Sequence, residues 1–387
     1  MTRRERLICT LRGEVVDRPA VNFYEIGGFT LVPDDPDPFN VYNDPSWSPL
    51  LRLAMEETDL IRHVAPLPSG KAADWNPVLP AAWREHFVSK TWTEGESRFT
   101  RTTLRVAGRE MTSLTRRDAG ANTVWTLEHL LKDADDAEAY LQLPDDPTTG
   151  AADPAHLLSA EREVGDRGIV MVDTMDPVCW VAALFDMEEW LLLAFRERKL
   201  VHRLLEKAAK HLHPVTERVA AAFPGRLWRI YGPEYASEPY LPPALFEEYV
   251  VRYTGPMVRA IQRPGGFARI HCHGRLRNIL SRIAEMKPDG LDPIEPPPQG
   301  DISLDEIHRA IGRETVLFGN LEVSDLENLP PAQFEPLVRR ALEQGTAPGG
   351  RGFVLMASAS PYGRTITPTT LANYETMVRL AKSWKRG

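Results

Sequence analysis

Two histidines separated by one residue form the sequence feature best suited to chemistry. His271 and His273 occur in FARIHCHG, whose apolar pattern predicts a strand, so their side chains share one face and Cys272 lies on the other. Imidazoles placed in this way can chelate one cation, with zinc, iron, nickel or copper preferred over magnesium. The alternative is a hydrogen-bonded histidine pair, one member of which orients a substrate or acts as a general acid.

A proline-rich segment after another predicted strand carries two carboxylates. In EPPPQGD, consecutive prolines between Glu295 and Asp301 fix φ and make the loop less flexible. Glu295 is therefore predicted to be a third metal ligand, a general base or an anchor for a cationic group of the substrate. Asp301 precedes LDEIHRA, and we expect it or Ser303 to cap the helix that follows.

Acidic and aromatic residues follow several other predicted strands. Glu234 lies among the tyrosines of YGPEYASEPY, a setting that suits a displaced carboxyl pKa and acid–base catalysis; an ion pair at the rim is the open alternative. Tyr24 and Glu25 end the first predicted strand and support the same role. Asp173 and Asp176 either face a substrate or bind backbone amides of their own turn. The predicted substrate-binding residues are Tyr235, Asp173, Asn320 and Tyr362.

Strands alternate regularly with helices, and this pattern must position those residues. Parallel strands joined by helical crossovers in about eight units predict a (β/α)8 TIM-type barrel, in which the carboxyl ends of the strands carry the chemistry. An open doubly wound sheet is the alternative, but no GxGxxG follows the first strand. The predicted strands are 18–25, 59–65, 168–174, 226–232, 267–273, 289–295, 315–320 and 352–357.

One segment departs from this alternation. Residues 86–128 are rich in Thr, Val, Arg and aromatic residues and are punctuated by GES, AGR and DAGAN, which predicts an antiparallel β-meander inserted into a single domain of residues 1–387. Farther along, residues 191–223 form a long helical stretch that Pro214 is expected to interrupt.

The composition excludes several classes of protein. A net charge of -8 disfavours nucleic-acid binding, and three scattered cysteines form neither a disulfide framework nor a CxxC zinc module. No apolar run is long enough to span a membrane, and the charged start MTRRERLICTLRGE does not match a signal peptide, so we expect a cytoplasmic protein. Walker, HExxH and GxSxG motifs are absent, which disfavours nucleotide-driven phosphoryl transfer and serine hydrolysis.

Four segments resemble the uroporphyrinogen decarboxylase superfamily over most of the chain outside the meander. These are RRERLICTLRGEVVDRPAVNF, GFARIHCHGRLRNIL, GDISLDEIHRAIGRETVLFGNLEVSDL and TITPTTLANYETMVRLA. The resemblance implies a distorted (β/α)8 barrel. It also implies one of two chemistries, namely metal-free decarboxylation of a tetrapyrrole's acetate arms, or zinc-dependent methyl transfer or demethylation linked to a corrinoid.

The sequence departs from both branches of that superfamily. FYEIGGF stands where the decarboxylases carry an arginine-rich segment, so Glu25 would repel a polycarboxylate. In the methyltransferases zinc is bound by a histidine and two cysteines, but only His271 matches; His273 replaces one cysteine, and Ser358 and Ser360 occur near the other. A His271, His273 and Glu295 site would leave a position open for substrate.

The sequence therefore predicts a metal-dependent methyltransferase or demethylase of a small molecule. Zinc is the expected metal, His271, His273 and Glu295 its ligands, and Glu234, His273, Tyr24 and Glu25 the catalytic groups. A corrinoid would arrive on a partner protein, no nucleic-acid or membrane partner is expected, and a homodimer is left open. The alternatives are a metal-free decarboxylase, in which His271 or His273 protonates the carbanion, and a non-catalytic small-molecule binder.

Overall fold

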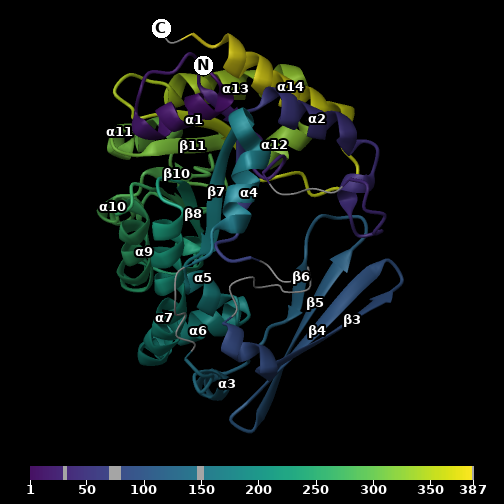
Figure 1. The fold of residues 1–387 in the computed structure, drawn as a ribbon, viewed down its shortest axis with the longest axis vertical. Helices are drawn as coiled ribbons and strands as arrows, with labels where there is room; N and C mark the ends of the chain where they lie inside the picture. Colours follow the sequence, from purple (N-terminus) through teal and green to yellow (C-terminus); the bar gives the residue numbers. More distant parts are fainter. Residues whose placement is uncertain (29–32, 69–79, 146–151, 386–387) are drawn as a thin grey trace.

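An eight-stranded parallel sheet forms the centre of the molecule. The computed structural model describes residues 1–28, 33–68, 80–145 and 152–385. The strands follow the order β1-β12-β11-β10-β9-β8-β7-β2 with helices between them, which confirms the predicted TIM-type barrel (Figure 1). Their bounds are β1 Ala20–Asn22, β2 Leu60–Val64, β7 Gly168–Met175, β8 Leu227–Tyr231, β9 Phe267–His271, β10 Gly290–Asp292, β11 Val316–Leu321 and β12 Phe353–Ala357.

Asp59 bridges the two edge strands and nearly closes the barrel. Its backbone N–H donates to the Val21 carbonyl at 2.8 Å, and its carboxylate accepts from the Val21 N–H at 2.9 Å. Arg6 and Arg18 neutralise this fully buried carboxylate at 2.6 Å and 2.8 Å. A side chain therefore replaces part of the ladder that a regular β1–β2 pair would form.

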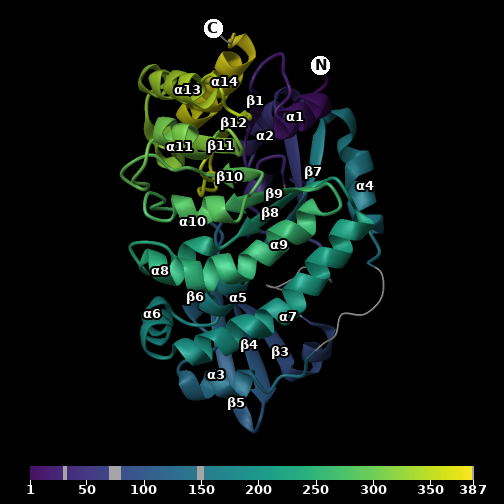
Figure 2. The ribbon, with the colours of Figure 1, turned by 90° about the vertical axis from the view of Figure 1, so that its left-hand side faces the viewer.

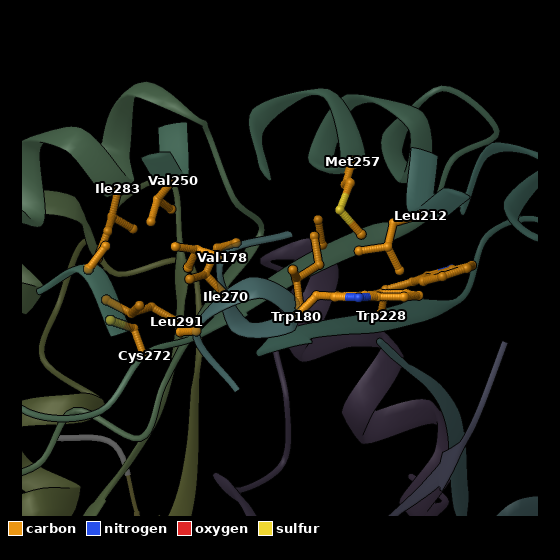
Figure 3. Close-up of a cluster of buried hydrophobic side chains, with 14 of the residues drawn as sticks. Val178, Trp180, Leu212, Trp228, Val250, Met257, Ile270, Cys272, Ile283 and Leu291 are labelled. Carbon is orange, nitrogen blue, oxygen red and sulfur yellow. The ribbon is translucent and has the colours of Figure 1, made fainter. Parts of the chain in front are cut away.

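Helices cover the outer face of the barrel with an apolar layer. Figure 3 shows Trp228, Ile270, Cys272 and Leu291 of the β8–β10 region among aliphatic and sulfur-containing side chains from the surrounding helices. Cys272 directly follows β9 and is buried in this layer, as predicted. The helices are α1 Arg3–Arg12, α2 Trp47–Glu57, α3 Ala134–Tyr140, α4 Ala155–Val164, α5 Pro177–Ala182, α6 Met187–Arg196, α7 Arg198–Ala222, α8 Pro243–Phe246, α9 Arg252–Gln262, α10 Leu280–Glu285, α11 Leu304–Ile311, α12 Val323–Asn328, α13 Pro331–Gly345 and α14 Pro368–Ser383.

The interior of the barrel changes from apolar to polar along its axis. Leu7 and Leu11 of α1 pack with Met171, Phe318 and Met356 in one buried cluster near the amino ends of the strands. Arginines and aspartates follow farther along the strands, and histidines lie nearest the carboxyl ends. The apolar end supports the fold, and the polar end is available for chemistry.

The β-meander is present as predicted, as a separate four-stranded antiparallel sheet. Its strands are β3 Phe87–Glu94, β4 Ser97–Val106, β5 Arg109–Asp118 and β6 Trp125–Glu128. Figures 1 and 2 show it near α3, α5 and α6, at the opposite end of the molecule from α1. The Asn122 N–H donates to the Tyr362 carbonyl at 2.7 Å, which ties the meander to the loop after β12.

Two local expectations are corrected by the structure. The break in residues 191–223 falls at Glu197 between α6 and α7, whereas α7 runs unbroken through Pro214, because buried side chains along its length hold it against the core. Ser303, not Asp301, caps α11, in a capping box with Glu306. The Asp301 carboxylate instead accepts from the backbone N–H groups of Leu276 and Arg277. No helix in the described part of the chain is long and apolar enough to cross a bilayer.

Candidate active site

Two arginines form a buried charged layer beneath the mouth of the barrel. Arg229 on β8 binds Asp173 on β7 through two hydrogen bonds of 2.7 Å and 2.8 Å. Arg269 on β9 binds Asp292 on β10, also through two hydrogen bonds. Sequence analysis missed both arginines, although each occurs alone inside an apolar strand segment, in RLWRIYG and GFARIHC. A charged residue in such a segment must find a buried partner, and that signal could have identified them.

His271 lies directly above this layer and is neutral. Its Nδ1 donates to Asp292 Oδ2 at 2.6 Å, which leaves Nε2 unprotonated and 3.4 Å from the Tyr24 hydroxyl. Burial lowers the pKa of His271 to about 4, despite the opposing charge of Asp292. The residue therefore accepts a hydrogen bond from Tyr24 and holds no transferable proton at neutral pH.

Tyr24 connects the two halves of this network. Its hydroxyl accepts from Arg229 Nη1 at 2.6 Å and is oriented to donate to His271. The residue adopts a left-handed backbone with φ 56°, held by a 2.9 Å hydrogen bond from its N–H to Asn22 Oδ1. Such a conformation is unfavourable for a bulky side chain, so the surrounding contacts must impose it. Burial raises the pKa of the Tyr24 phenol, which stays protonated.

His273 is paired with a carboxylate, and this pairing favours its protonated form. Its Nδ1 lies 2.8 Å from Glu295 Oε1, and the Gly274 N–H donates to Glu295 Oε2 at 2.6 Å. Burial lowers the pKa of His273, but the hydrogen bond to Glu295 and the charges of Glu295 and Glu234 outweigh it, so the pKa is raised. Gly300 lets the proline loop fold back tightly on Glu295, because a Cβ there would overlap the Glu295 carbonyl oxygen.

The two histidine rings meet at the mouth but have different surroundings. Their centroids are 4.6 Å apart and their planes are nearly perpendicular at 88°. The His273 side chain is 35% exposed, whereas that of His271 is 6% exposed. Proton exchange with a ligand or with solvent is therefore expected at His273.

Three further carboxyl groups lie around the two histidines. In the described part of the chain, none of the three has a cationic side chain at ion-pair distance. Burial raises the pKa values of Glu25, Glu234 and Glu322. Glu234 lies in a short 3-10 helix, Pro233–Ala236, and its Oε2 is buried without a hydrogen-bond partner among the described residues. Glu322, which sequence analysis did not select, accepts from Ser358 Oγ at 3.2 Å. The mouth thus has an excess of carboxyl groups.

The other predicted residues are distributed around this centre. Asp173 is occupied by Arg229, and Asp176 caps α5 by accepting from the Cys179 N–H at 2.7 Å. Tyr235 packs against the apolar core, and Tyr362 is 53% exposed on the loop after β12. Asn320 lines a hollow of about 300 Å³ beside the proline loop, together with Glu322. The structure therefore joins Tyr24, His271, His273 and Glu295 by direct contacts, with the remaining residues farther out.

The predicted zinc ligands do not fit a metal ion as they are placed here. Both oxygens of Glu295 are engaged by His273 and Gly274, so this carboxylate has no oxygen free of a hydrogen bond for a metal, and His271 Nε2 lies 3.4 Å from the Tyr24 hydroxyl. Within residues 1–28, 33–68, 80–145 and 152–385, no three His, Cys, Asp or Glu side chains are arranged to hold a metal. Zinc therefore stays a prediction and enters no step below.

The parallel barrel, with a cluster of titratable side chains at the carboxyl ends of its strands, places this protein among the enzymes built on the (β/α)8 fold. The family model for uroporphyrinogen decarboxylase (URO-D) matches residues 126–384, and the chain belongs to that family. A solved methyltransferase from Methanosarcina mazei has a TM-score of 0.59 and 17% identity over 98% of each chain, so it is similar in fold. None of the curated proteins matches this sequence.

Proposed function

We propose that this protein transfers a methyl group to or from a small molecule at the mouth of the barrel, with His273 as the proton donor to the departing heteroatom. The observation that carries the proposal is the His273–Glu295 pair, with a raised His273 pKa and a partly exposed ring. Loss of a methyl group leaves a basic oxygen or nitrogen, and a nearby imidazolium can protonate it as the bond breaks. General acid catalysis of this kind contributes about 10²- to 10⁴-fold to a rate.

The neighbouring residues stabilise the protonated His273 ring and hold the side chains beside it in place. Glu295 stabilises the imidazolium, and solvent can return the proton because His273 is partly exposed. In the opposite direction the neutral ring would accept the proton of the methyl acceptor. Arg229 and His271 hold the Tyr24 hydroxyl in place, so that it forms a fixed wall beside the two imidazoles.

The charge of the mouth favours neutral or cationic substrates. Arg229 and Arg269 are each neutralised by an aspartate, and Glu25, Glu234 and Glu322 are left over. Such a site repels a polycarboxylate and suits a methylated amine or ether. A corrinoid on a partner protein, which the family resemblance implies, would supply or accept the methyl group; the exposure of His273 and Tyr362 leaves the mouth accessible to it.

The direct test is methyl transfer from small methylated amines or ethers to free cob(I)alamin, which becomes methylcobalamin, followed by absorbance for the unmodified protein and His273→Gln. We expect turnover that falls by about 10²-fold or more in the variant. Turnover that His273→Gln leaves unchanged would refute the assigned role.

Decarboxylation of a small carboxylate is the second candidate, because the same His273 imidazolium could protonate a carbanion. Release of carbon dioxide from candidate acids in the presence of a chelator, with no methyl transfer, would favour this reaction over the first. The surplus of carboxyl groups at the mouth is the observation against it.

A further inference from the structure

A large hollow lies beside the β-meander, and the proposed methyl transfer does not use it. Its volume is about 710 Å³, and it is lined by the inner face of β3–β6 together with residues 129–130 and 183–184. It therefore lies next to α5, whose other end begins at Asp176 beside the candidate active site. A cavity of this size accommodates a small molecule.

On the inner face of the meander, residues paired across neighbouring strands are of the same chemical type. Each such row of cross-strand neighbours is called a rung here. An apolar rung pairs Leu104 with Met111. Toward the other end of the strands come two hydroxyl rungs and then an arginine rung that pairs Arg98 with Arg117. The hydroxyl rungs are Ser89–Thr102–Ser113 and Thr91–Thr100–Thr115.

The hydroxyl rungs form a regular array of donors and acceptors. Ser89 Oγ lies 3.0 Å from Thr102 Oγ1, and Thr91 Oγ1 lies 3.0 Å from Thr100 Oγ1. Neighbouring strands are spaced by about 4.8 Å and successive rungs by about 6.8 Å, so the array extends roughly 10 Å by 7 Å. Hydroxyls can both donate and accept, which matches the hydroxyl groups of a sugar ring.

Part of the lining of the hollow is apolar. It is contributed by Val124, Leu130, Ala183 and Leu184. A pyranose or furanose ring has a C–H face that packs on such side chains while its hydroxyls point to the array. The hollow is thus suited to a flat ligand with one polar and one apolar side.

The two arginines at the end of the array differ in their charge balance. Arg98 forms hydrogen bonds of 2.8 Å and 2.7 Å with Asp37, so its charge is neutralised. Arg117 makes one long hydrogen bond of 3.4 Å to Asn122 Oδ1, and its buried Nε has no partner. No carboxylate in the described ranges forms an ion pair with Arg117. Asp37 is near enough to interact electrostatically with Arg117 but is hydrogen-bonded to Arg98, so the two arginines share one carboxylate. One positive charge of the pair is thus left to bind an anion.

We infer that this hollow binds a sugar carrying one anionic group, with the ring hydroxyls on the two Ser/Thr rungs and the phosphate or carboxylate on Arg117. The site is separate from the His273–Glu295 centre, so the inference does not depend on the proposed function.

Titration calorimetry with glucose 6-phosphate, glucuronate, glucose and inorganic phosphate tests this site. We expect one of the two charged sugars to bind with a Kd below about 1 mM and more tightly than glucose or phosphate alone. Arg117→Gln should weaken that binding by about tenfold or more, and Thr115→Val by about threefold to tenfold. The stronger of the two charged sugars identifies the anion.

Thr103→Val is the matched control, because Thr103 lies on the neighbouring strand β4 but on the outer face of the meander. It should leave binding unchanged, and circular dichroism should show all variants folded. The inference is overturned if neither charged sugar binds, if phosphate alone binds as tightly, or if Thr103→Val weakens binding as much as Thr115→Val.

Discussion

Arg229 and Arg269 are paired in register on neighbouring strands, so two like charges lie side by side inside the barrel. Both are buried, at 5% and 1% exposure. Asp173 neutralises the first from β7 and Asp292 the second from β10, so each arginine is balanced from the side away from the other. The arrangement is stable only while both carboxylates are ionised, since an unpaired buried charge is costly.

Replacement of Asp292 by Asn should expose this dependence. The carboxylate is fully buried and binds both Arg269 and His271, so we expect the free energy of unfolding at pH 7 to fall by about 3–5 kcal/mol. Arg269 and His271 hold the pKa of Asp292 well below its ordinary range, against the effect of burial. The stabilisation is therefore complete above about pH 4 and declines below it, so the difference between the two proteins should narrow in acid.

Urea unfolding at pH 7 and at pH 3 measures both effects. Asp305→Asn is the control, because Asp305 pairs with Arg309 on an exposed helix face and should change stability by no more than about 0.5 kcal/mol. Equal losses in the two variants would contradict the assigned role of the buried pair.

The barrel could be predicted from the sequence because each strand and helix has its own local pattern. The helix predicted over residues 304–311 is α11, for example, and the strand predicted over residues 315–320 is β11 with its bounds shifted by one residue. The continuity of α7 through Pro214 could not be predicted in this way, since it depends on side chains packed against other elements. Closure by Asp59 is likewise a contact between segments that no local pattern encodes.

The candidate site was predictable only in part for the same reason. The HxH spacing predicted that His271 and His273 lie together, and their rings do meet, although His273 lies just beyond the end of β9. The proline loop brings Glu295 to His273. Which carboxylate binds which histidine depends on the β9–β10 register, in which Asp292 pairs with His271. That register makes Glu295 a hydrogen-bond partner of His273, a role that the HxH spacing alone does not specify.

Pro214→Ala should stabilise the protein. Proline lacks the N–H that would donate to the carbonyl of Lys210, and its cost inside a helix is up to about 3 kcal/mol relative to alanine. Greater freedom of the unfolded chain offsets about 0.4–1 kcal/mol of the gain. We expect a net increase of about 1–2 kcal/mol in denaturant unfolding. A loss of stability would show that α7 has adapted its packing to the proline ring.

The metal content of the purified protein tests the prediction that His271, His273 and Glu295 bind zinc. Because both oxygens of Glu295 are engaged in hydrogen bonds, we expect less than stoichiometric zinc in protein purified without a polyhistidine tag. Mass spectrometry of the metals after dialysis measures this content directly. Zinc bound at one per chain and lost in both His271→Ala and His273→Ala would show that the side chains rearrange around a metal.

Glu295→Gln should shift the titration of His273 without removing the histidine. Glu295 raises the pKa of His273 through its hydrogen bond and its charge, so the neutral amide should lower that pKa. A reaction that needs the imidazolium is fastest below the His273 pKa and declines as the pH rises through it, so the alkaline limb of kcat/KM should move to lower pH. Histidine NMR titration of both proteins measures the same shift without any substrate. Glu285→Gln, an exposed change on α10, should leave both profiles unchanged. A His273 titration that is identical with and without the Glu295 charge would contradict the proton-donor assignment.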